Sequence, residues 1–411
     1  MPSVLGRYDV RAKIGEGGMA TVYVGRERDG ERRAVALKVI KDEFSINREF
    51  VNMFIDEARI VARLSHPNVV KLHELGNEGG RLFIVMELLS GHSLWELWEA
   101  SRARKLPLGY DRVAWIGARI ADGLHHAHEL TDDKGERQRI VHRDVNATNV
   151  FVSYDGSVKI IDFGLAKAIN RVSKTAAGVV KGKLAYLSPE QASGQEVDQR
   201  ADVFALGTTL WELSTDRRLF RQNDDIETLK KIHAAVIPDP TTLLPDFPQD
   251  LWKILQRALA RDRTQRYATA ADMAKDLDAF VGKRVGAADV SSLMDQLFAA
   301  ERQRQEAWLA EVSGTKAGVP HGTLKPPTNH AAVIPVVVPP SRLPSEALIA
   351  KAIQPRSPSV EAPATHIRHS VPVSLASQDK LKSRPRSAKI LLLVIVAIVA
   401  VMIVLAVISR S

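Results

Sequence analysis

Two rhythms of hydrophobic and polar residues alternate along the first 281 positions of the chain. Tyr8–Ile14 and Thr21–Val24 are strand-like, and Ala34–Ile40 is an apolar, strand-like run interrupted by one lysine. Phe50–Leu64 instead repeats its apolar side chains at the spacing of an amphipathic helix. Short stretches rich in Gly, Asn and Asp separate these segments, and no internal repeat is visible. The pattern predicts an α+β fold over residues 8–281.

Beyond this region the pattern changes twice. Residues 286–313 place apolar side chains such as Val290 and Leu293 at near-helical spacing, which predicts one accessory helix. Residues 314–389 hold twelve of the twenty prolines and almost no sustained periodicity. A Pro-rich chain of this kind cannot bury enough apolar surface to offset its conformational entropy, so we expect a disordered linker.

The last stretch of the sequence is uniformly apolar. Residues 390–408 are nineteen apolar residues without a charge or a proline. As a helix they would be about 28 Å long, close to the ~30 Å hydrocarbon core of a bilayer. Basic residues between Lys380 and Lys389 precede them, and this charge bias places the N-terminal side in the cytoplasm. The sequence therefore predicts one transmembrane helix, with a buried core helix or strand as the alternative, and no N-terminal signal peptide is visible.

Composition and charge exclude several classes of protein. The apolar fraction of 45% and the charged fraction of 26% are ordinary for a globular chain. There is no cysteine, which excludes disulfides, thiolate metal sites and thiol nucleophiles. The net charge is +9, but residues 314–389 alone carry eleven basic and three acidic residues, whereas residues 1–313 carry 45 of each. Because the basic excess lies in the tail, we expect no nucleic-acid partner.

Candidate chemistry begins in the glycine-rich segment that joins the first two strands. Gly15, Gly17 and Gly18 allow a sharp turn and let backbone N–H groups approach phosphate oxygens. A dinucleotide-binding turn would require a helix directly after these glycines, but the chain continues as a strand. This favours a β hairpin that closes over a nucleotide, and an ordinary glycine-rich turn is the alternative.

A lysine and a glutamate in apolar surroundings follow. Alternation places Lys38 on one face of its strand, where a buried ammonium is costly unless an anion meets it. Glu57 lies among apolar residues of the helical segment that follows. An ion pair between Lys38 and Glu57 is the simplest way to satisfy both, and a lysine that extends into solvent is the alternative.

A third motif completes the pattern. Val141–Asn149 contains His142, Arg143 and Asp144, and a predicted strand pair then leads into Asp162–Phe163–Gly164. In this order, and together with the glycine hairpin and Lys38, residues 8–281 resemble a protein kinase and are most similar to the eukaryotic-like serine/threonine kinases of bacteria. The resemblance implies a two-lobed fold, with a small β-rich N-lobe (8–88) and a larger helical C-lobe (89–281).

The resemblance also implies an activity and a site. The activity is ATP-dependent phosphorylation of Ser or Thr in protein substrates, with Mg²⁺, or Mn²⁺ in its place, as the metal. Asp144 would orient the attacking hydroxyl, Lys38 and Glu57 would act as a pair, and oxygens of Asn149 and Asp162 would hold the metal. The residues expected to bind ATP are Ile14, Gly15, Glu16, Gly17, Gly18, Met19, Ala20, Thr21, Val22, Ala36, Lys38, Met86, Glu87, Leu89 and Phe151.

Five further residues receive supporting roles from the same resemblance. Phe163 would pack in the column that joins the lobes, and Asp202 would cap the backbone of the catalytic loop. Arg266 would pair with Glu190, which ends the activation segment. Without the order of the motifs, these charges would be interpreted as surface charge at helix ends. Arg143, next to the catalytic aspartate, would meet a phosphorylated residue of the activation segment, with Thr175 as first choice and Ser173 as second.

The sequence departs from the family most seriously at Asn146. These kinases usually have a lysine there, and its loss is expected to cost on the order of 2–4 kcal/mol of barrier. A second departure, Lys183 in place of a usual threonine, suggests the hypothesis that its ammonium restores the charge; the alternative is a solvated lysine. Ala20, in place of the third glycine, is a milder change.

The sequence-based interpretation is a kinase held by its C-terminal helix in the inner (cytoplasmic) membrane of a bacterium. Its catalytic domain would lie in the cytoplasm. The expected partners are protein substrates, the bilayer, and a second copy of the chain for trans-autophosphorylation. The rival interpretation is a membrane-tethered pseudokinase that binds nucleotide or partners without transfer, and Asn146 is its main support.

Overall fold

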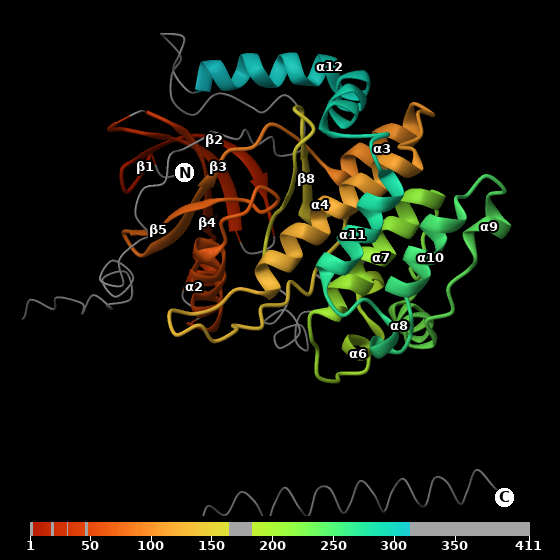
Figure 1. The fold of residues 1–411 in the computed structure, drawn as a ribbon. Helices are drawn as coiled ribbons and strands as arrows, with labels where there is room; N and C mark the ends of the chain where they lie inside the picture. The colour runs from red at the N-terminus through yellow and green to blue at the C-terminus, as the bar shows by residue number, and fades with distance from the viewer. Residues whose placement is uncertain (1–2, 18–19, 31, 46–47, 164–182, 313–411) are drawn as a thin grey trace, which may run out of the picture. The chain divides into compact units, whose positions relative to one another are not determined.

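The structure is a computed structural model that describes residues 3–17, 20–30, 32–45, 48–163 and 183–312 (Figure 1). Several predictions fall outside these residues, namely those for Ser173, Thr175, the linker at 314–389 and the apolar segment at 390–408. Among the described residues, none of the helices is both long and apolar enough to cross a bilayer.

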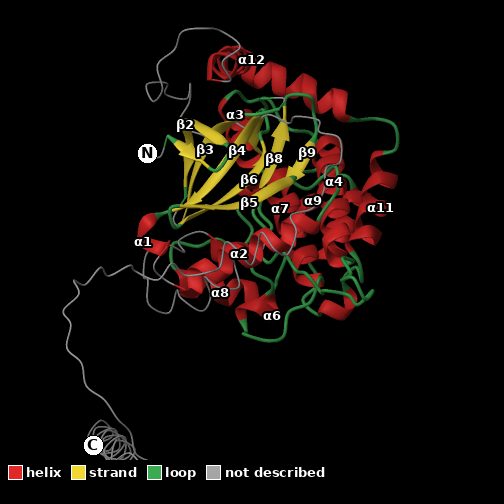
Figure 2. Cartoon of the chain, turned by 90° about the vertical axis from the view of Figure 1, so that its left-hand side faces the viewer, coloured by secondary structure: helices red, strands yellow, loops and turns green. Residues whose placement is uncertain are grey.

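The first ninety residues form an antiparallel sheet that is flanked by two helices, α1 (Asp42–Ser45) and α2 (Arg48–Arg63) (Figure 2). Within the described residues the sheet has six strands, in the order β1-β2-β3-β4-β6-β5. In chain order they are β1 (Val4–Leu5), β2 (Tyr8–Glu16), β3 (Ala20–Glu27), β4 (Ala34–Ile40), β5 (Leu72–Glu78) and β6 (Arg81–Glu87).

A β-bulge directs the two parts of β2 to opposite faces of this sheet. In the pairing with β3, Arg11 is an extra residue between Val10 and Ala12. The residues before the bulge pack in one apolar cluster and those after it in another. The two clusters also contain the neighbouring residues Leu37 and Ala36 of β4, whose side chains point to opposite faces. The bulge thus turns the end of β2 toward the C-lobe side of the sheet.

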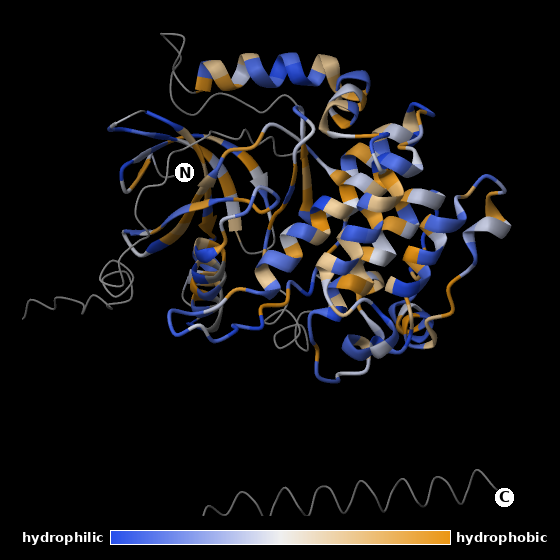
Figure 3. Cartoon of the chain, viewed as in Figure 1, coloured by the Kyte–Doolittle hydropathy of each residue, from blue (hydrophilic) through white to orange (hydrophobic). Residues whose placement is uncertain are grey.

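The rest of the described chain is mainly helical and starts with a small sheet of β7 (Gly91–Ser93), β8 (Val150–Ser153) and β9 (Val158–Ile160). Figure 3 shows hydrophobic positions concentrated in the packed strands and in α7, which is buried along nearly its whole length. The helices are α3 (Leu94–Ala103), α4 (Tyr110–His128), α6 (Pro189–Ala192), α7 (Arg200–Thr215), α8 (Asp225–Ala234), α9 (Pro240–Leu243), α10 (Gln249–Ala258), α11 (Ala270–Val281) and α12 (Ala287–Val312), with short 3₁₀ turns η1 (Ala147–Asn149), η2 (Lys183–Tyr186) and η3 (Arg263–Gln265).

The accessory helix α12 is kinked rather than continuous, contrary to the sequence-based expectation of one helix over 286–313. Phe298 has φ −135° and ψ 21°, which is not helical. Its ring stacks on that of His92, with 3.9 Å between the centroids. The break thus coincides with the packing of this ring against β7, a contact that apolar periodicity does not reveal.

Candidate active site

One buried carboxylate shapes the loop between α4 and β8. Asp202, in the first turn of α7, accepts hydrogen bonds from the backbone N–H groups of His142 and Arg143 at 2.8 Å each, and from Nε2 of His128 at 2.8 Å. Burial opposes its ionisation, but the hydrogen bond and charge of His128 hold the pKa of Asp202 below its ordinary value. Arg143 has φ 67°, a left-handed conformation that these hydrogen bonds stabilise against its strain.

Two amide side chains hold the carboxylate of Asp144. Asn146 donates through Nδ2 to Oδ1 of Asp144 at 2.9 Å, and Asn149 donates through Nδ2 to Oδ2 at 2.9 Å. Asn146 in turn accepts a hydrogen bond from the backbone N–H of Thr148 at 2.9 Å. The carboxylate is therefore fixed in one orientation. The sequence-based interpretation of Asn146 missed this, because it considered the missing positive charge and not the donors of an amide.

An ion pair joins the two lobes. Nζ of Lys38, on β4, lies 2.7 Å from Oδ1 of Asp162, which follows β9. The side chain of Lys38 is 8% exposed and that of Asp162 is 41% exposed. The pair therefore joins a buried ammonium to a carboxylate that is open to solvent. Glu57 lies on α2, but its side chain is outside the described part of the structure. The pairing of Lys38 with Glu57 stays a prediction.

The backbone brings Asn149 next to the segment that carries Asp162. The N–H group of Ile161 donates to the carbonyl of Asn149 at 2.9 Å. Asp162 has φ 60°, and the residue after it, Phe163, is fully buried against the ring of His142, with centroids 4.6 Å apart. The packing of Phe163 thus fixes the strained position from which Asp162 reaches Lys38.

The oxygen atoms gathered here fit a hard divalent cation. Because Asn149 donates through Nδ2 to Asp144, its Oδ1 points away from that carboxylate. Asp162 adds a partly exposed carboxylate. No cluster of three or more His, Cys, Asp or Glu able to hold a metal occurs among the described residues. Two protein ligands completed by phosphate oxygens and water are what Mg²⁺ accepts, so the donor set suits the expected metal.

The face of the sheet that carries Lys38 also carries the apolar residues predicted to meet the base. Val22 pairs directly with Lys38, and Met86 pairs with Ala36, two residues before Lys38 on β4. Directly paired residues point to the same face. Val22, Met86 and Ala36 pack in one apolar cluster with Ile14. The predicted wall of the adenine site is therefore continuous in the fold.

The glycine-rich hairpin joins β2 to β3. The N–H group of Gly17 donates to the carbonyl of Ala20 at 2.8 Å, which closes the base of the turn. Hydrogen bonds and charges from Lys13 and Lys41 lower the pKa of Glu16 to about 2. The carboxylate of Glu16 is therefore paired with two lysines of the N-lobe. Gly15 lies near the end of β2 and Thr21 near the start of β3, whereas Gly18 and Met19 are outside the described residues.

The side chain of Glu87 anchors the connection between the lobes, whereas the sequence assigned a role only to its backbone carbonyl. The carboxylate of Glu87 lies 2.9 Å from Nζ of Lys159 and accepts a hydrogen bond from the N–H of Lys71 at 2.7 Å. Leu89 and Phe151 are both buried. Contacts of the Glu87 carbonyl and the Leu89 amide with a base stay a prediction.

The end of the activation segment is held by a second buried pair. Nη1 and Nη2 of Arg266 donate to the two carboxylate oxygens of Glu190 at 2.7 and 2.9 Å, and both side chains are buried. Burial opposes ionisation of Glu190, but the hydrogen bonds and charge of Arg266 hold its pKa below the ordinary value. Lys183 lies at the start of η2, but its side chain is outside the described part of the chain.

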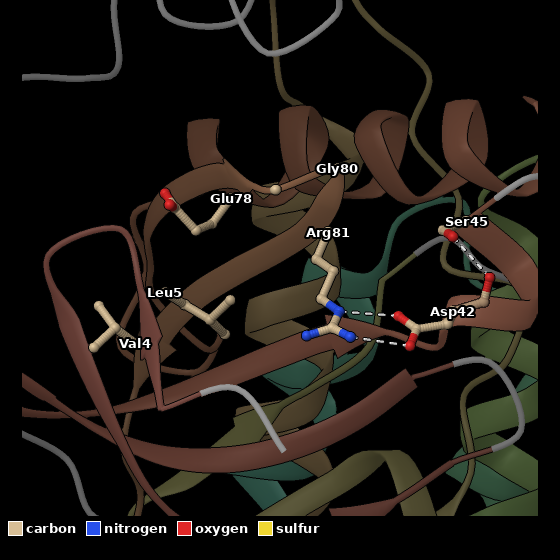
Figure 4. A pocket seen from close by; sticks show the side chains of 8 residues that line it. Val4, Leu5, Asp42, Ser45, Glu78, Gly80 and Arg81 are labelled. Atoms are coloured by element: carbon tan, nitrogen blue, oxygen red, sulfur yellow. Dashed lines mark hydrogen bonds and ion pairs between the residues drawn. The ribbon is translucent and has the colours of Figure 1, made fainter. Parts of the chain in front are cut away.

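A hollow in the N-lobe is separate from this site (Figure 4). It is lined by residues of β1, α1 and the turn between β5 and β6. The close-up shows Arg81 bound to Asp42 by two hydrogen bonds, of 3.0 and 3.2 Å. None of the residues that the sequence assigns to the site lines this hollow.

Comparison with known proteins agrees with this geometry. Residues 8–277 match the family model described as the protein kinase domain. The chain belongs to the protein kinase family. A crystal structure of the PknI kinase domain from Mycobacterium tuberculosis aligns with a TM-score of 0.53 and 25% sequence identity, over 69% of this chain and 99% of the crystallised kinase domain. The predicted two-lobed fold, with a β-rich N-lobe and a helical C-lobe, is thereby confirmed.

Curated relatives of this kinase carry two kinds of name. Tyrosine-protein kinase MasK of Myxococcus xanthus is 37% identical over 325 residues, which is 77% of this chain and 50% of MasK. Serine/threonine-protein kinase PrkC of Bacillus subtilis is 34% identical over 67% of this chain and 40% of PrkC. Serine/threonine-protein kinase PknL of Mycobacterium tuberculosis is 36% identical over 66% of this chain and 65% of PknL. The kinase thus spans about two fifths to two thirds of the length of these relatives.

Proposed function

We propose that this protein is an ATP-dependent serine/threonine protein kinase. The observation that carries the proposal is the convergence of Lys38 from the N-lobe with Asp144, Asn149 and Asp162 from the C-lobe. These groups match the needs of phosphoryl transfer, which are charge for the phosphates, oxygen ligands for a divalent ion and a carboxylate for the acceptor hydroxyl. The family match and the relatives PrkC and PknL support the same activity.

The reaction is transfer of the γ-phosphoryl group of ATP to a hydroxyl. A bond forms between the acceptor oxygen and the γ-phosphorus, the bond from that phosphorus to the β–γ bridging oxygen breaks, and ADP leaves. Asp144, held by Asn146 and Asn149, orients the acceptor hydroxyl and receives its proton. Lys38 faces the phosphates. Asn149 and Asp162 would hold Mg²⁺, which would neutralise charge on the triphosphate. Mn²⁺ accepts similar oxygen ligands and could take its place.

The acceptor amino acid is tested by labelling. The full chain is incubated with Mg²⁺, γ-labelled ATP and a protein substrate mixture, with Asp162→Asn as the matched control. We expect label on phosphoserine and phosphothreonine, and at least about 100-fold less label with the variant, since electrostatic groups at the transferring phosphate contribute this much. Label confined to phosphotyrosine, as the name MasK would suggest, overturns the acceptor assignment. No transfer by the wild type would favour the pseudokinase.

We also propose that Lys183 supplies the positive charge that Asn146 lacks. The support is the sequence pattern, together with the start of η2 at Lys183. Kinetics of Lys183→Ala beside Lys181→Ala test the proposal, because the two variants lose the same charge two positions apart. A selective fall in kcat for Lys183→Ala supports it, and an equal effect of the two substitutions ends it.

Phosphorylation of the activation segment is a third proposal. Nε of Arg143 is buried and has no hydrogen-bond partner among the described residues. A phosphate on Thr175, or on Ser173 as the second choice, would supply strong acceptor oxygens to this guanidinium. Mass spectrometry of the autophosphorylated chain checks the positions. A rate that rises with the square of the protein concentration would support phosphorylation in trans within a transient homodimer, and a first-order rate would contradict it.

The location of the protein is proposed from its sequence. We propose that residues 390–408 anchor the chain as a single-pass protein in the inner membrane of a bacterium, with the catalytic domain in the cytoplasm. The basic end of the linker would then lie near anionic lipid headgroups, where each Lys or Arg contributes about 1 kcal/mol. Cell fractionation of the full chain and of a variant without 390–408 tests this. Retention of the shortened protein in the membrane fraction would contradict the proposal.

A further inference from the structure

Helix α12 is attached to the C-lobe by its first half. Oγ of Ser291 donates to the carbonyl of Tyr154 at 2.6 Å. The helix starts so close to the turn after β8 that a Cβ atom on Gly156 would clash with the carbonyl oxygen of Ala287. Together with the stacking of Phe298 on the small sheet, these contacts fix the direction in which the second half of α12 leaves the C-lobe.

The second half of α12 reaches the connection between the lobes and then the N-lobe, as Figure 1 shows for this helix, in cyan. Gln305 is 3% exposed, and its Oε1 accepts a hydrogen bond from Oγ of Ser90 at 2.8 Å. In the two turns that follow, Trp308, Leu309 and Val312 are all at least nine-tenths buried. Figure 3 shows this end of α12 as more hydrophobic than its middle.

These three buried residues pack against the nucleotide-facing side of the N-lobe sheet. Trp308, Leu309 and Val312 form one apolar cluster with residues that include Ile14 and Ala36. Val22 and Met86 pack against the same cluster. Ala36 is two residues from Lys38 on the same face of β4, a distance of about 7 Å along the strand. The end of α12 thus belongs to the same apolar cluster as the wall that is assigned to the adenine base.

The indole N–H of Trp308 shows what holds this contact together. Nε1 is buried and has no hydrogen-bond partner within the described part of the chain. A buried indole N–H usually has an acceptor, so Trp308 is kept in place by the fit of its rings and not by its polar atom. A phenyl ring should therefore replace the indole far better than a methyl group does.

We propose that the second half of α12 is a constituent of the nucleotide site, in which Trp308, Leu309 and Val312 position the apolar wall formed by Ile14, Val22, Ala36 and Met86. The inference rests on the proposed ATP-dependent function. The three residues are positioning residues, since they act through the wall. Removing them takes apolar surface away from the nucleotide-facing side of the sheet, so the wall residues are held less firmly and ATP binding weakens. Asp144 and its two amides lie outside the cluster, so turnover at saturating ATP is retained.

The test uses the full chain and compares four proteins. They are the wild type, Trp308→Ala, Trp308→Phe and Trp252→Ala; Trp252 is a tryptophan of α10 with similar burial, 8% exposed against 6% for Trp308. The dissociation constant of Mg-ATP, the KM for ATP, kcat and the thermal unfolding midpoint are measured for each. Leu309→Ala, which removes less volume, takes the place of Trp308→Ala if that variant does not fold.

We expect Trp308→Ala to raise both the dissociation constant and the KM about tenfold, a factor that corresponds to 1.4 kcal/mol of binding free energy. Its kcat should stay within about twofold, and Trp308→Phe should restore most of the affinity. Trp252→Ala should lower the unfolding midpoint without changing the affinity. A folded Trp308→Ala or Leu309→Ala variant with wild-type affinity overturns the inference, and so does an equal loss of affinity in Trp252→Ala. Wild-type protein that binds ATP without transferring phosphate would contradict only the proposed kinase function. Absence of ATP binding would contradict both that function and the inference about α12.

Discussion

The two ends of the proposed nucleotide site are built by different forces. At the catalytic end, hydrogen bonds and an ion pair fix single groups, as with Asp144 between two amides and Lys38 against Asp162. At the adenine end, apolar side chains from four strands and α12 pack together in one cluster. Hydrogen bonds are directional, whereas apolar contact depends mainly on buried area. Single-atom changes should therefore alter turnover at the first end, and changes of volume should alter nucleotide affinity at the second.

Among the changes that test this comparison, we expect Asp202→Ala to have the largest effect, a loss of folding stability. Asp202→Ala leaves His128 and two backbone N–H groups without their acceptor in a fully buried place. Removing one partner from a buried ionic group costs about 3–5 kcal/mol, and we expect the free energy of unfolding in denaturant to fall by this amount. Asp250→Ala, which breaks a solvent-exposed pair with Lys253, should leave the free energy of unfolding nearly unchanged. Equal losses for the two variants would refute the role given to Asp202.

The next effect concerns pH and the buried pair of Glu190 and Arg266. The pKa of Glu190 is lowered from 4.5 in the folded protein, because Arg266 outweighs the opposing effect of burial. Stability from such a carboxyl is fully present above the unfolded pKa and is lost as pH falls through the lower, folded value.

Glu190→Gln should therefore be less stable than the wild type at pH 7 by about 2–3 kcal/mol, the contribution of a hydrogen bond to a charged group. The difference between the two proteins should shrink as the pH falls below about 4.5. Thermal unfolding between pH 7 and pH 3 measures both quantities. A difference that stays constant across this range would show that ionisation of Glu190 does not stabilise the pair.

At Asn146 the expected effect is on turnover alone. Asn146→Ala removes the donor to Oδ1 of Asp144 and leaves the donor from Asn149. A lost hydrogen bond of about 1.4 kcal/mol corresponds to a tenfold lower kcat. The KM for ATP should not change, because the apolar cluster is untouched. Steady-state kinetics separate the two constants, and a changed KM with unchanged kcat would reverse the assignment.

The smallest effect belongs to the adenine end. Gln305→Ala removes the acceptor for the hydroxyl of Ser90, and we expect the KM for ATP to rise about threefold, as for the loss of a weak neutral hydrogen bond. Here kcat should not change. Gln296→Ala is the matched control, since Gln296 is an exposed residue of the same helix. If both variants behaved alike, the contact between α12 and Ser90 would have no part in nucleotide binding.

The sequence predicted local elements from neighbouring residues and, through the family resemblance, the roles of motif residues that lie far apart along the chain. The strands around the glycine hairpin follow from local alternation. The order of the motifs at Lys38, Asp144 and Asp162 predicts, by resemblance, which residues would act in catalysis. The pairing of Glu190 with Arg266 was expected on the same ground, and the structure places the two side chains in contact.

The features that the sequence did not predict depend on contacts between distant segments. The bulge at Arg11 turns the side chains at the end of β2 to the other face of the sheet, and simple alternation cannot show this change. The periodicity of α12 predicts a helix but not the surface that it meets, since Ser90 and Gln305 are 215 positions apart. The hydrogen bond from Asn146 to Asp144 depends on the conformation of a loop, which residue types alone do not specify.

The most direct test of the kinase assignment measures Mg-ATP binding and phosphoryl transfer on the same preparations of the wild type and Asp144→Ala. We expect equal dissociation constants for Mg-ATP, because Asp144 is assigned to the acceptor hydroxyl and lies outside the apolar cluster. Transfer should fall at least about 100-fold, the lower range for loss of a group that handles the proton. Unchanged transfer by Asp144→Ala, or a variant that loses ATP binding instead, would contradict the site assigned here.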